Sequence, residues 1–221
     1  MRSGLGFWAA VVALLAAVAY GIPQLLQVAG VLHDPWDRIL IFAPSLVLAP
    51  AFVAAMACLH VVTPASRQTY SIVGLAFAIM YGTLVSIVYV TQLSVVIPND
   101  LAGAGAATDI FACCGARQFT TGVDLTGYTL MSFATFAAAF AFAEANAASR
   151  CSRWTFIANG VLAPFLVAQT AWPWLIYVGA LWLITFPVSM IGLARAFSGR
   201  DDAMLEIHSR NLDARVHFNE V

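Results

Sequence analysis

The chain has 221 residues, of which 62% are hydrophobic and only 10% are charged, and its formal net charge is -1. Soluble domains carry about 25% charged and about 45–50% apolar residues, so this composition excludes a water-soluble globule and indicates a membrane protein. The chain also offers no cationic surface for phosphate groups, and we therefore expect no nucleic-acid partner.

The apolar stretches predict six membrane-spanning helices, because each is close to the roughly 20 residues that cross about 30 Å of hydrocarbon. Proline, histidine and charged residues separate these stretches. The predicted spans are residues 7–30, 39–62, 70–97, 125–147, 154–171 and 175–197. We therefore expect an all-α polytopic membrane protein, a six-transmembrane-helix bundle over residues 1–197 with a cytoplasmic tail over residues 198–221.

The first span contains Ala17-Val18-Ala19, which resembles the cleavage site of a signal peptide. The apolar pattern continues to Gly30 and is long enough to cross a membrane, so we expect this helix to be retained. Cleavage would leave five spans in the same orientation.

The distribution of arginine predicts the orientation, because short cytoplasmic loops carry an excess of basic residues. Both termini in the cytoplasm would place eight arginines inside and only Arg38 and Arg117 outside. The eight are Arg2, Arg67, Arg150, Arg153, Arg195, Arg200, Arg210 and Arg215. We therefore expect both ends of the chain to face the cytoplasm.

Three stretches carry a resemblance to known proteins. His33–Pro50 leads into a proline-containing span, Gly74–Tyr81 continues to Tyr89–Pro98, and Asp124–Met131 opens the fourth span. Together they resemble a group of uncharacterised bacterial six-helix integral membrane proteins, over most of residues 35–197. The resemblance implies a multi-pass protein of the bacterial inner (plasma) membrane, and it implies no activity.

Three glutamines lie at a similar depth in separate predicted spans. At about 1.5 Å of rise per residue, Gln24, Gln92 and Gln169 fall roughly 8–12 Å to the outer side of the midplane. Tyr89 lies one turn from Gln92 and Tyr81 lies on nearly the same face. If these faces converge, they form an uncharged ligand-binding pocket that opens outward. The alternative is hydrogen bonding between helices, which contributes about 0.6 kcal/mol on average.

Glu144 is the only acidic residue well inside a predicted span, and Asn159 follows on the next helix. A carboxylate with an amide neighbour in a membrane is a candidate for binding a cation or relaying a proton. The alternative is that Glu144 reaches water or pairs with Arg150 or Arg153.

Asp124 stands at the start of the fourth predicted span. An acidic side chain there complements the positive end of the helix dipole, so we predict a capping role. Gly127, three residues later, permits close helix packing.

Cys113 and Cys114 are adjacent in the predicted outer loop 98–124. Such a pair is a candidate for a vicinal disulfide, a redox switch or half of a metal site. The alternative is two loop cysteines without a catalytic role. A single pair lacks the further ligands of a closed zinc site, so we expect no metal. Cys58 and Cys151 should not pair with them.

The residue inventory excludes several chemistries. The chain has no lysine, and it lacks GxSxG, HExxH and glycine-rich phosphate motifs. No histidine pair suits a haem within the membrane. We therefore expect no enzyme, no catalytic residues and no cofactor. The sequence favours a non-enzymatic membrane subunit or scaffold, and the alternative is a small transporter or channel for a small solute or ion. The expected partners are the lipid bilayer and a membrane protein or a second copy.

Overall fold

The computed structural model describes residues 2–115, 118–142 and 147–198, and every regular element among them is a helix. The first part contains α1 (Arg2–Val28), α2 (Trp36–Val62), η1 (Ala65–Arg67), α3 (Gln68–Thr91), the π-helical segment η2 (Gln92–Val96), α4 (Ile97–Leu101), η3 (Gly105–Ala107) and η4 (Asp109–Phe111). The second part contains α5 (Phe119–Ala139), α6 (Ala147–Gly160), α7 (Ala163–Ala168), η5 (Pro173–Leu175) and α8 (Ile176–Gly179). The stretch Pro173–Ser198, here called the C-terminal helix, begins with η5 and α8.

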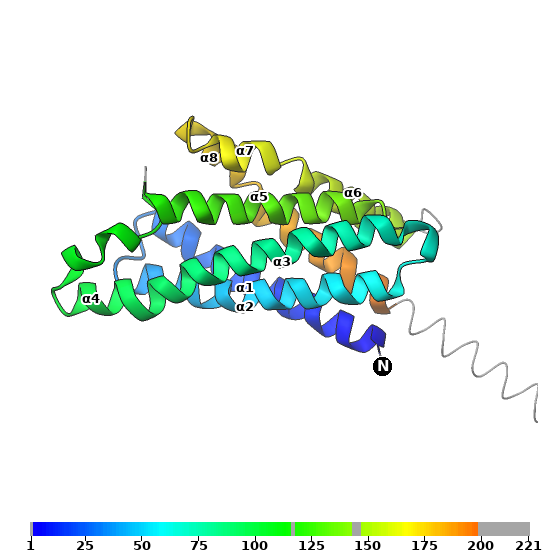
Figure 1. Cartoon of the computed structure of the whole chain (residues 1–221), viewed down its shortest axis with the longest axis horizontal. Coiled ribbons are helices and arrows are strands. Elements are labelled where there is room, and N and C mark those ends of the chain that lie inside the picture. Colours follow the sequence, from blue (N-terminus) through cyan, green and yellow to red (C-terminus); the bar gives the residue numbers. More distant parts are fainter. Residues whose placement is uncertain (1, 116–117, 143–146, 199–221) are drawn as a thin grey trace, which may run out of the picture.

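Within the described residues, five helices are long and apolar enough to cross a membrane. They are Gly4–Val28, Trp36–Val62, Ala65–Leu101, Ser149–Ala168 and Pro173–Ser198. These helices support the prediction of an all-helical membrane protein. The fourth predicted span corresponds to α5, which lies beside α3 in the bundle but is not among the five (Figure 1). The tail over residues 199–221 lies outside the described residues.

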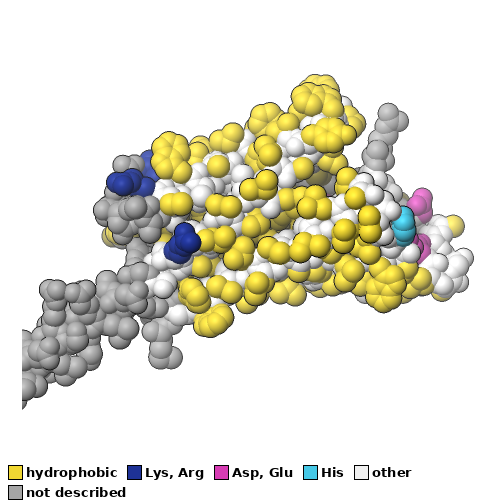
Figure 2. Space-filling view, turned by 180° about the vertical axis from the view of Figure 1, so that it is seen from behind, with side chains coloured by type: hydrophobic (Ala, Val, Ile, Leu, Met, Phe, Trp, Pro, Cys, Tyr) yellow, Lys and Arg dark blue, Asp and Glu magenta, His cyan; other side chains and the backbone are white. Residues whose placement is uncertain are grey.

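The bundle has two ends of different composition. The end that holds the connection 29–35 and the segments α4, η3 and η4 is here called the loop end. The opposite end, where α1 begins and η1 connects α2 to α3, is here called the terminal end (Figure 1). In Figure 2 an apolar surface covers the side of the molecule, while the charged side chains gather toward the two ends. This pattern is typical of a membrane protein.

Small residues bring α1 and α2 together as an antiparallel hairpin. Ala9, Ala10, Ala13 and Ala17 of α1 are buried, and such small side chains let α1 approach its neighbours in the bundle closely. The C-terminal helix packs against both. Its Phe186 meets Phe52 of α2 edge to face, with the ring centroids 5.5 Å apart.

Glycines set the distance between α3 and α5. A Cβ atom at Gly127 would lie 2.6 Å from Cγ1 of Val85, and one at Gly74 would lie 2.9 Å from the carbonyl oxygen of Ala134. The prediction of close packing at Gly127 is confirmed.

The start of α5 differs from the prediction. The helix begins at Phe119, so Asp124 lies in its second turn and the first turn holds no acidic residue. The predicted capping role of Asp124 is therefore wrong. Hydrogen bonds from Thr120 and Thr121 to the carbonyl groups of Ala112 and Gly115 anchor the additional turn to the preceding loop.

Candidate functional site

A group of polar and aromatic side chains from α1, α3, α5 and the C-terminal helix meets near the loop end. We call it the Asp124 cluster, and its members are Tyr20, Tyr81, Tyr89, Asp124, Tyr128 and Trp182. The Tyr89 hydroxyl donates a hydrogen bond of 2.8 Å to the Tyr128 hydroxyl, and it also faces the Asp124 carboxylate. Trp182 packs edge to face on Tyr128, with the ring centroids 5.0 Å apart.

Three polar atoms of this cluster are buried without a hydrogen-bond partner in the structure. They are Oδ1 of Asp124, the hydroxyl oxygen of Tyr81 and Nε1 of Trp182. A buried polar group that lacks a partner costs about 1–3 kcal/mol, so such groups are rare in native proteins and often belong to functional sites. The cluster thus combines an unpaired acceptor on a carboxylate with unpaired donors on aromatic rings.

A disulfide bond joins Cys113 and Cys114 directly beside the cluster. The ligand atoms of both cysteines and of Asp124 all lie within 4.8 Å of one another. Cys113 is partly buried and Cys114 is exposed. Cys58 and Cys151 are free thiols, which confirms that they do not pair with the vicinal cysteines.

Glutamine side chains hold the backbone of both cysteines in place. Oε1 of Gln92 accepts a hydrogen bond of 3.1 Å from the amide of Cys113, while Nε2 of Gln92 donates to the carbonyl oxygen of Phe111 at 2.7 Å. Oε1 of Gln118 accepts hydrogen bonds from the amides of Cys114 and Gly115. Gln92 is fully buried and begins the π-helical segment η2. Such segments are frequent at functional sites.

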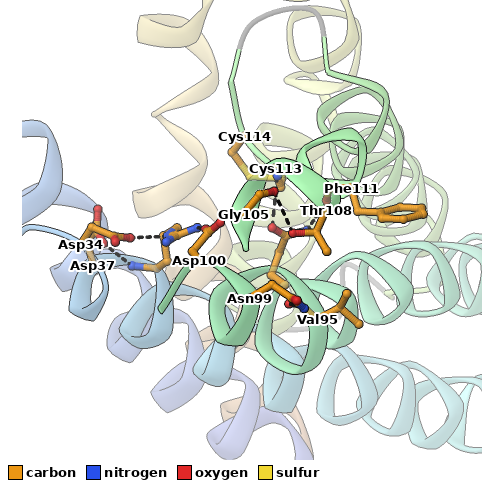
Figure 3. Close-up of polar contacts among 12 residues, drawn as sticks. Asp34, Asp37, Val95, Asn99, Asp100, Gly105, Thr108, Phe111, Cys113 and Cys114 are labelled. Atoms are coloured by element: carbon orange, nitrogen blue, oxygen red, sulfur yellow. Dashed lines mark hydrogen bonds and ion pairs between the residues drawn. A yellow bond between two sulfur atoms is a disulfide. The ribbon is translucent and has the colours of Figure 1, made fainter. Parts of the chain in front are cut away.

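An ionic network closes the neighbouring part of the loop end. The Arg38 side chain donates to the carboxylates of Asp34 and Asp100, the latter at 2.6 Å, and so ties the start of α2 to α4. Figure 3 shows these ion pairs beside the segment that carries Cys113 and Cys114. These ion pairs therefore hold α4, which precedes the cysteine loop in the chain, against the start of α2.

The structure brings together only part of the predicted outward pocket. Tyr89, Tyr81 and Gln92 lie in or next to the Asp124 cluster. Gln24 instead donates a hydrogen bond to Gln27, which in turn donates to Asp37 at 2.8 Å. The amide of Gln169 lies beside Gly179 of α8.

Asn159 lies in a different place and makes a complete set of contacts there. Its Nδ2 donates to the Thr135 hydroxyl at 3.0 Å, and its Oδ1 accepts a bond of 2.9 Å from the Thr185 hydroxyl. The side chain is fully buried and links α5, α6 and the C-terminal helix. Glu144, which the sequence predicts as the carboxylate neighbour of Asn159, lies outside the described residues.

Sequence reasoning missed three members of the Asp124 cluster, Tyr20, Tyr128 and Trp182, and assigned a fourth, Asp124, to another role. Tyr20 and Trp182 occur in apolar runs where an aromatic residue carries no signal of its own. Asp124 was interpreted as a helix cap because its position in α5 was misplaced. One signal was available, since Asp124, Gly127 and Tyr128 occur at helical spacing.

An open groove on the surface between α3 and α5 runs past this region. It is lined by Leu84, Gln118, Phe119, Gly122, Val123 and Thr126. Its lining is mainly apolar, so it differs from the polar pocket that the sequence predicted.

Comparison with known proteins finds no matching family model, no matching curated protein and no matching solved structure.

Proposed function

We propose that this chain is a multi-pass membrane protein that binds a small cation at the Asp124 cluster, and that it acts as a small transporter or channel. The observation that supports the proposal is the Oδ1 atom of Asp124, which is buried and makes no hydrogen bond to the described protein. A carboxylate inside a bundle is expensive unless a charge compensates it, and such residues mark ion pathways. The phenol oxygens of Tyr89 and Tyr128 would supply further oxygen ligands.

We also propose that α5 is the sixth span and that the loop end faces away from the cytoplasm. Five described arginines flank the helix ends at the terminal end, whereas Arg38 lies at the loop end. The five are Arg2, Arg67, Arg150, Arg153 and Arg195. The excess of basic residues supports a cytoplasmic terminal end. The resemblance to bacterial six-helix membrane proteins supports a bacterial inner membrane.

The test is ion flux into vesicles that contain the purified protein. Two fluxes are recorded: protons, which an imposed membrane potential drives inward and an enclosed pH dye reports, and externally added Zn²⁺, which an enclosed zinc-sensitive dye reports. We expect Asp124→Asn to lower the rate at least tenfold, since the variant removes the charge and keeps the shape. Asp109→Asn, a variant of an exposed aspartate at the same end, should leave the rate unchanged. Wild-type vesicles no faster than empty ones would overturn the proposal.

A second candidate is the non-enzymatic membrane subunit that the sequence favours. The supporting observation is the turn between α7 and α8, which projects at the upper edge of the bundle in Figure 1. Trp172 and Trp174 of this turn expose 59% and 63% of their surface, and Tyr177 of α8 exposes 81%. Aromatic side chains of this kind are enriched among the residues that anchor protein partners. Native mass spectrometry of the gently extracted protein tests this function, and a partner at fixed ratio would favour it over transport.

A further inference from the structure

We propose that Cys113 and Cys114, once their disulfide is reduced, bind one soft metal ion together with the carboxylate of Asp124. This inference rests on the proposed function, because it specifies the chemical class of the cation that we propose to bind at the Asp124 cluster. The three ligand atoms lie within 4.8 Å of one another. With metal–sulfur bonds of about 2.3 Å, two thiolates on one tetrahedral ion lie about 3.8 Å apart, so the two sulfurs must separate after their bond breaks, and the Asp124 oxygen must lie within bonding distance of the same ion.

The loop keeps its position without the disulfide, because other bonds fix it. The amide of Cys113 is held by Gln92 from η2, and the amide of Cys114 is held by Gln118 at the start of α5. The hydroxyl of Thr121 donates to the carbonyl oxygen of Gly115 at 2.9 Å. Breaking the Sγ–Sγ bond therefore leaves both thiols beside Asp124.

The Asp124 carboxylate is available as the third ligand. Its Oδ1 is buried and has no hydrogen-bond partner, and no ion pair to it occurs within the described part of the chain. The Tyr89 hydroxyl faces the carboxylate but brings no charge. Burying a carboxylate without a paired cation is costly, and a bound divalent ion would remove that cost. Arg38, the arginine that the structure describes at the loop end, is already paired with Asp34 and Asp100.

The donor set determines which ion the site prefers. Thiolates select soft or borderline ions such as zinc and copper(I) over magnesium or calcium. Three protein ligands leave a fourth position open, as in zinc sites that exchange a ligand. The site thus suits an ion that must enter and leave rather than a permanently buried structural ion.

The oxidation state of the cysteines controls the site. An external dithiol supplies two electrons and two protons, forms its own disulfide and converts the Cys113–Cys114 bond into two thiols. A divalent ion then binds the two thiolates and the two thiol protons pass to solvent. Reoxidation by a disulfide of an external molecule returns both electrons to that molecule, re-forms the Sγ–Sγ bond and expels the ion.

The experiment is a cadmium titration of the full-length protein in detergent. The protein is reduced with dithiothreitol, desalted without oxygen and titrated with Cd²⁺, while the sulfur-to-cadmium charge-transfer absorption and the heat of binding are recorded. We expect one Cd²⁺ per chain in the reduced protein and no charge-transfer band in the oxidised protein. Asp124→Asn should weaken binding about tenfold or more, and Cys113→Ser should abolish the band.

The matched control is the double variant Cys58→Ser with Cys151→Ser, which lacks the two free thiols and should bind as the wild type does. Loss of the band in this control would overturn the site, as would its absence from the reduced wild type. Asp124-dependent ion flux in a protein that binds no Cd²⁺ would refute the metal site alone and leave the proposed function in place.

Discussion

Individual polar residues inside this bundle differ in whether their hydrogen bonds are complete. Asn159 and Gln92 are fully buried, and both the amide nitrogen and the amide oxygen of each have protein partners. The buried Oδ1 of Asp124 has none. A satisfied amide stabilises the packing of helices, whereas an unsatisfied carboxylate oxygen is available to a ligand. This difference distinguishes polar residues that stabilise helix packing from residues of a candidate site. It depends on distances between atoms of different helices, which sequence spacing alone cannot provide.

Replacing Asn159 tests whether its hydrogen bonds stabilise the packing of the helices. Asn159→Ala leaves the hydroxyls of Thr135 and Thr185 without their shared partner, so we expect the free energy of unfolding to fall by about 1–2 kcal/mol. Titration with a denaturing detergent, followed by circular dichroism, measures the change. Thr126→Ala is the control, because that exposed threonine bonds only to its own helix. Asn159 would be a ligand residue instead if stability stayed the same and ion flux fell.

Gln92 should control the order of the cysteine loop. Gln92→Leu keeps a similar volume but removes the bonds to the amide of Cys113 and the carbonyl of Phe111. We expect the amide of Cys113 to exchange its hydrogen at least tenfold faster, measured by mass spectrometry of peptides from the labelled protein. Ser94→Ala, in the same π-helical segment, removes a bond within its own helix and should not change this rate. An equal rate in both variants would show that Gln92 does not anchor the loop.

Helices were predictable where their hydrophobicity was continuous. The predicted spans 7–30, 39–62, 70–97, 154–171 and 175–197 each overlap one of the five long apolar helices. The fourth span differs because α5 mixes Asp124 with many serine and threonine hydroxyls, so its apolar pattern gives a poor signal for where the helix begins. Close packing at Gly127 was predictable, since only a glycine lets helices approach so closely.

The contact between α3 and α5 should be sensitive to one methyl group. Gly127→Ala places a Cβ atom 2.6 Å from Cγ1 of Val85, so the helices must separate and the free energy of unfolding should fall by about 1–3 kcal/mol. Gly122→Ala, on the same helix, meets no atom within 4 Å and should be neutral or stabilising by up to about 1 kcal/mol. Thermal unfolding of both variants in detergent measures the difference. Equal stability would mean that α3 and α5 are not in tight contact.

At the scale of the whole molecule, the Asp124 cluster depends on contacts between helices that are far apart in sequence. Tyr20 and Trp182 are separated by most of the chain, yet their rings lie 5.8 Å apart between centroids. The sequence predicts that Gln24 and Gln169 lie at the same membrane depth as Gln92. Depth alone does not show which face of each helix points into the bundle. The candidate site could therefore be predicted only where its residues share a helix, as Tyr89 and Gln92 do.

The orientation of the molecule can be tested with its own cysteines, because Cys114 and Cys151 are both exposed and lie at opposite ends. Two variants are needed, one that keeps only Cys114 and one that keeps only Cys151, with the other cysteines changed to serine. If the terminal end is cytoplasmic, a membrane-impermeant maleimide should label Cys114 on intact cells and should label Cys151 only after permeabilisation. Gel-shift analysis of the labelled protein measures both. The opposite pattern would invert the topology, and the cysteine pair would then face a reducing compartment in which the thiol form, and with it the metal-binding form, prevails.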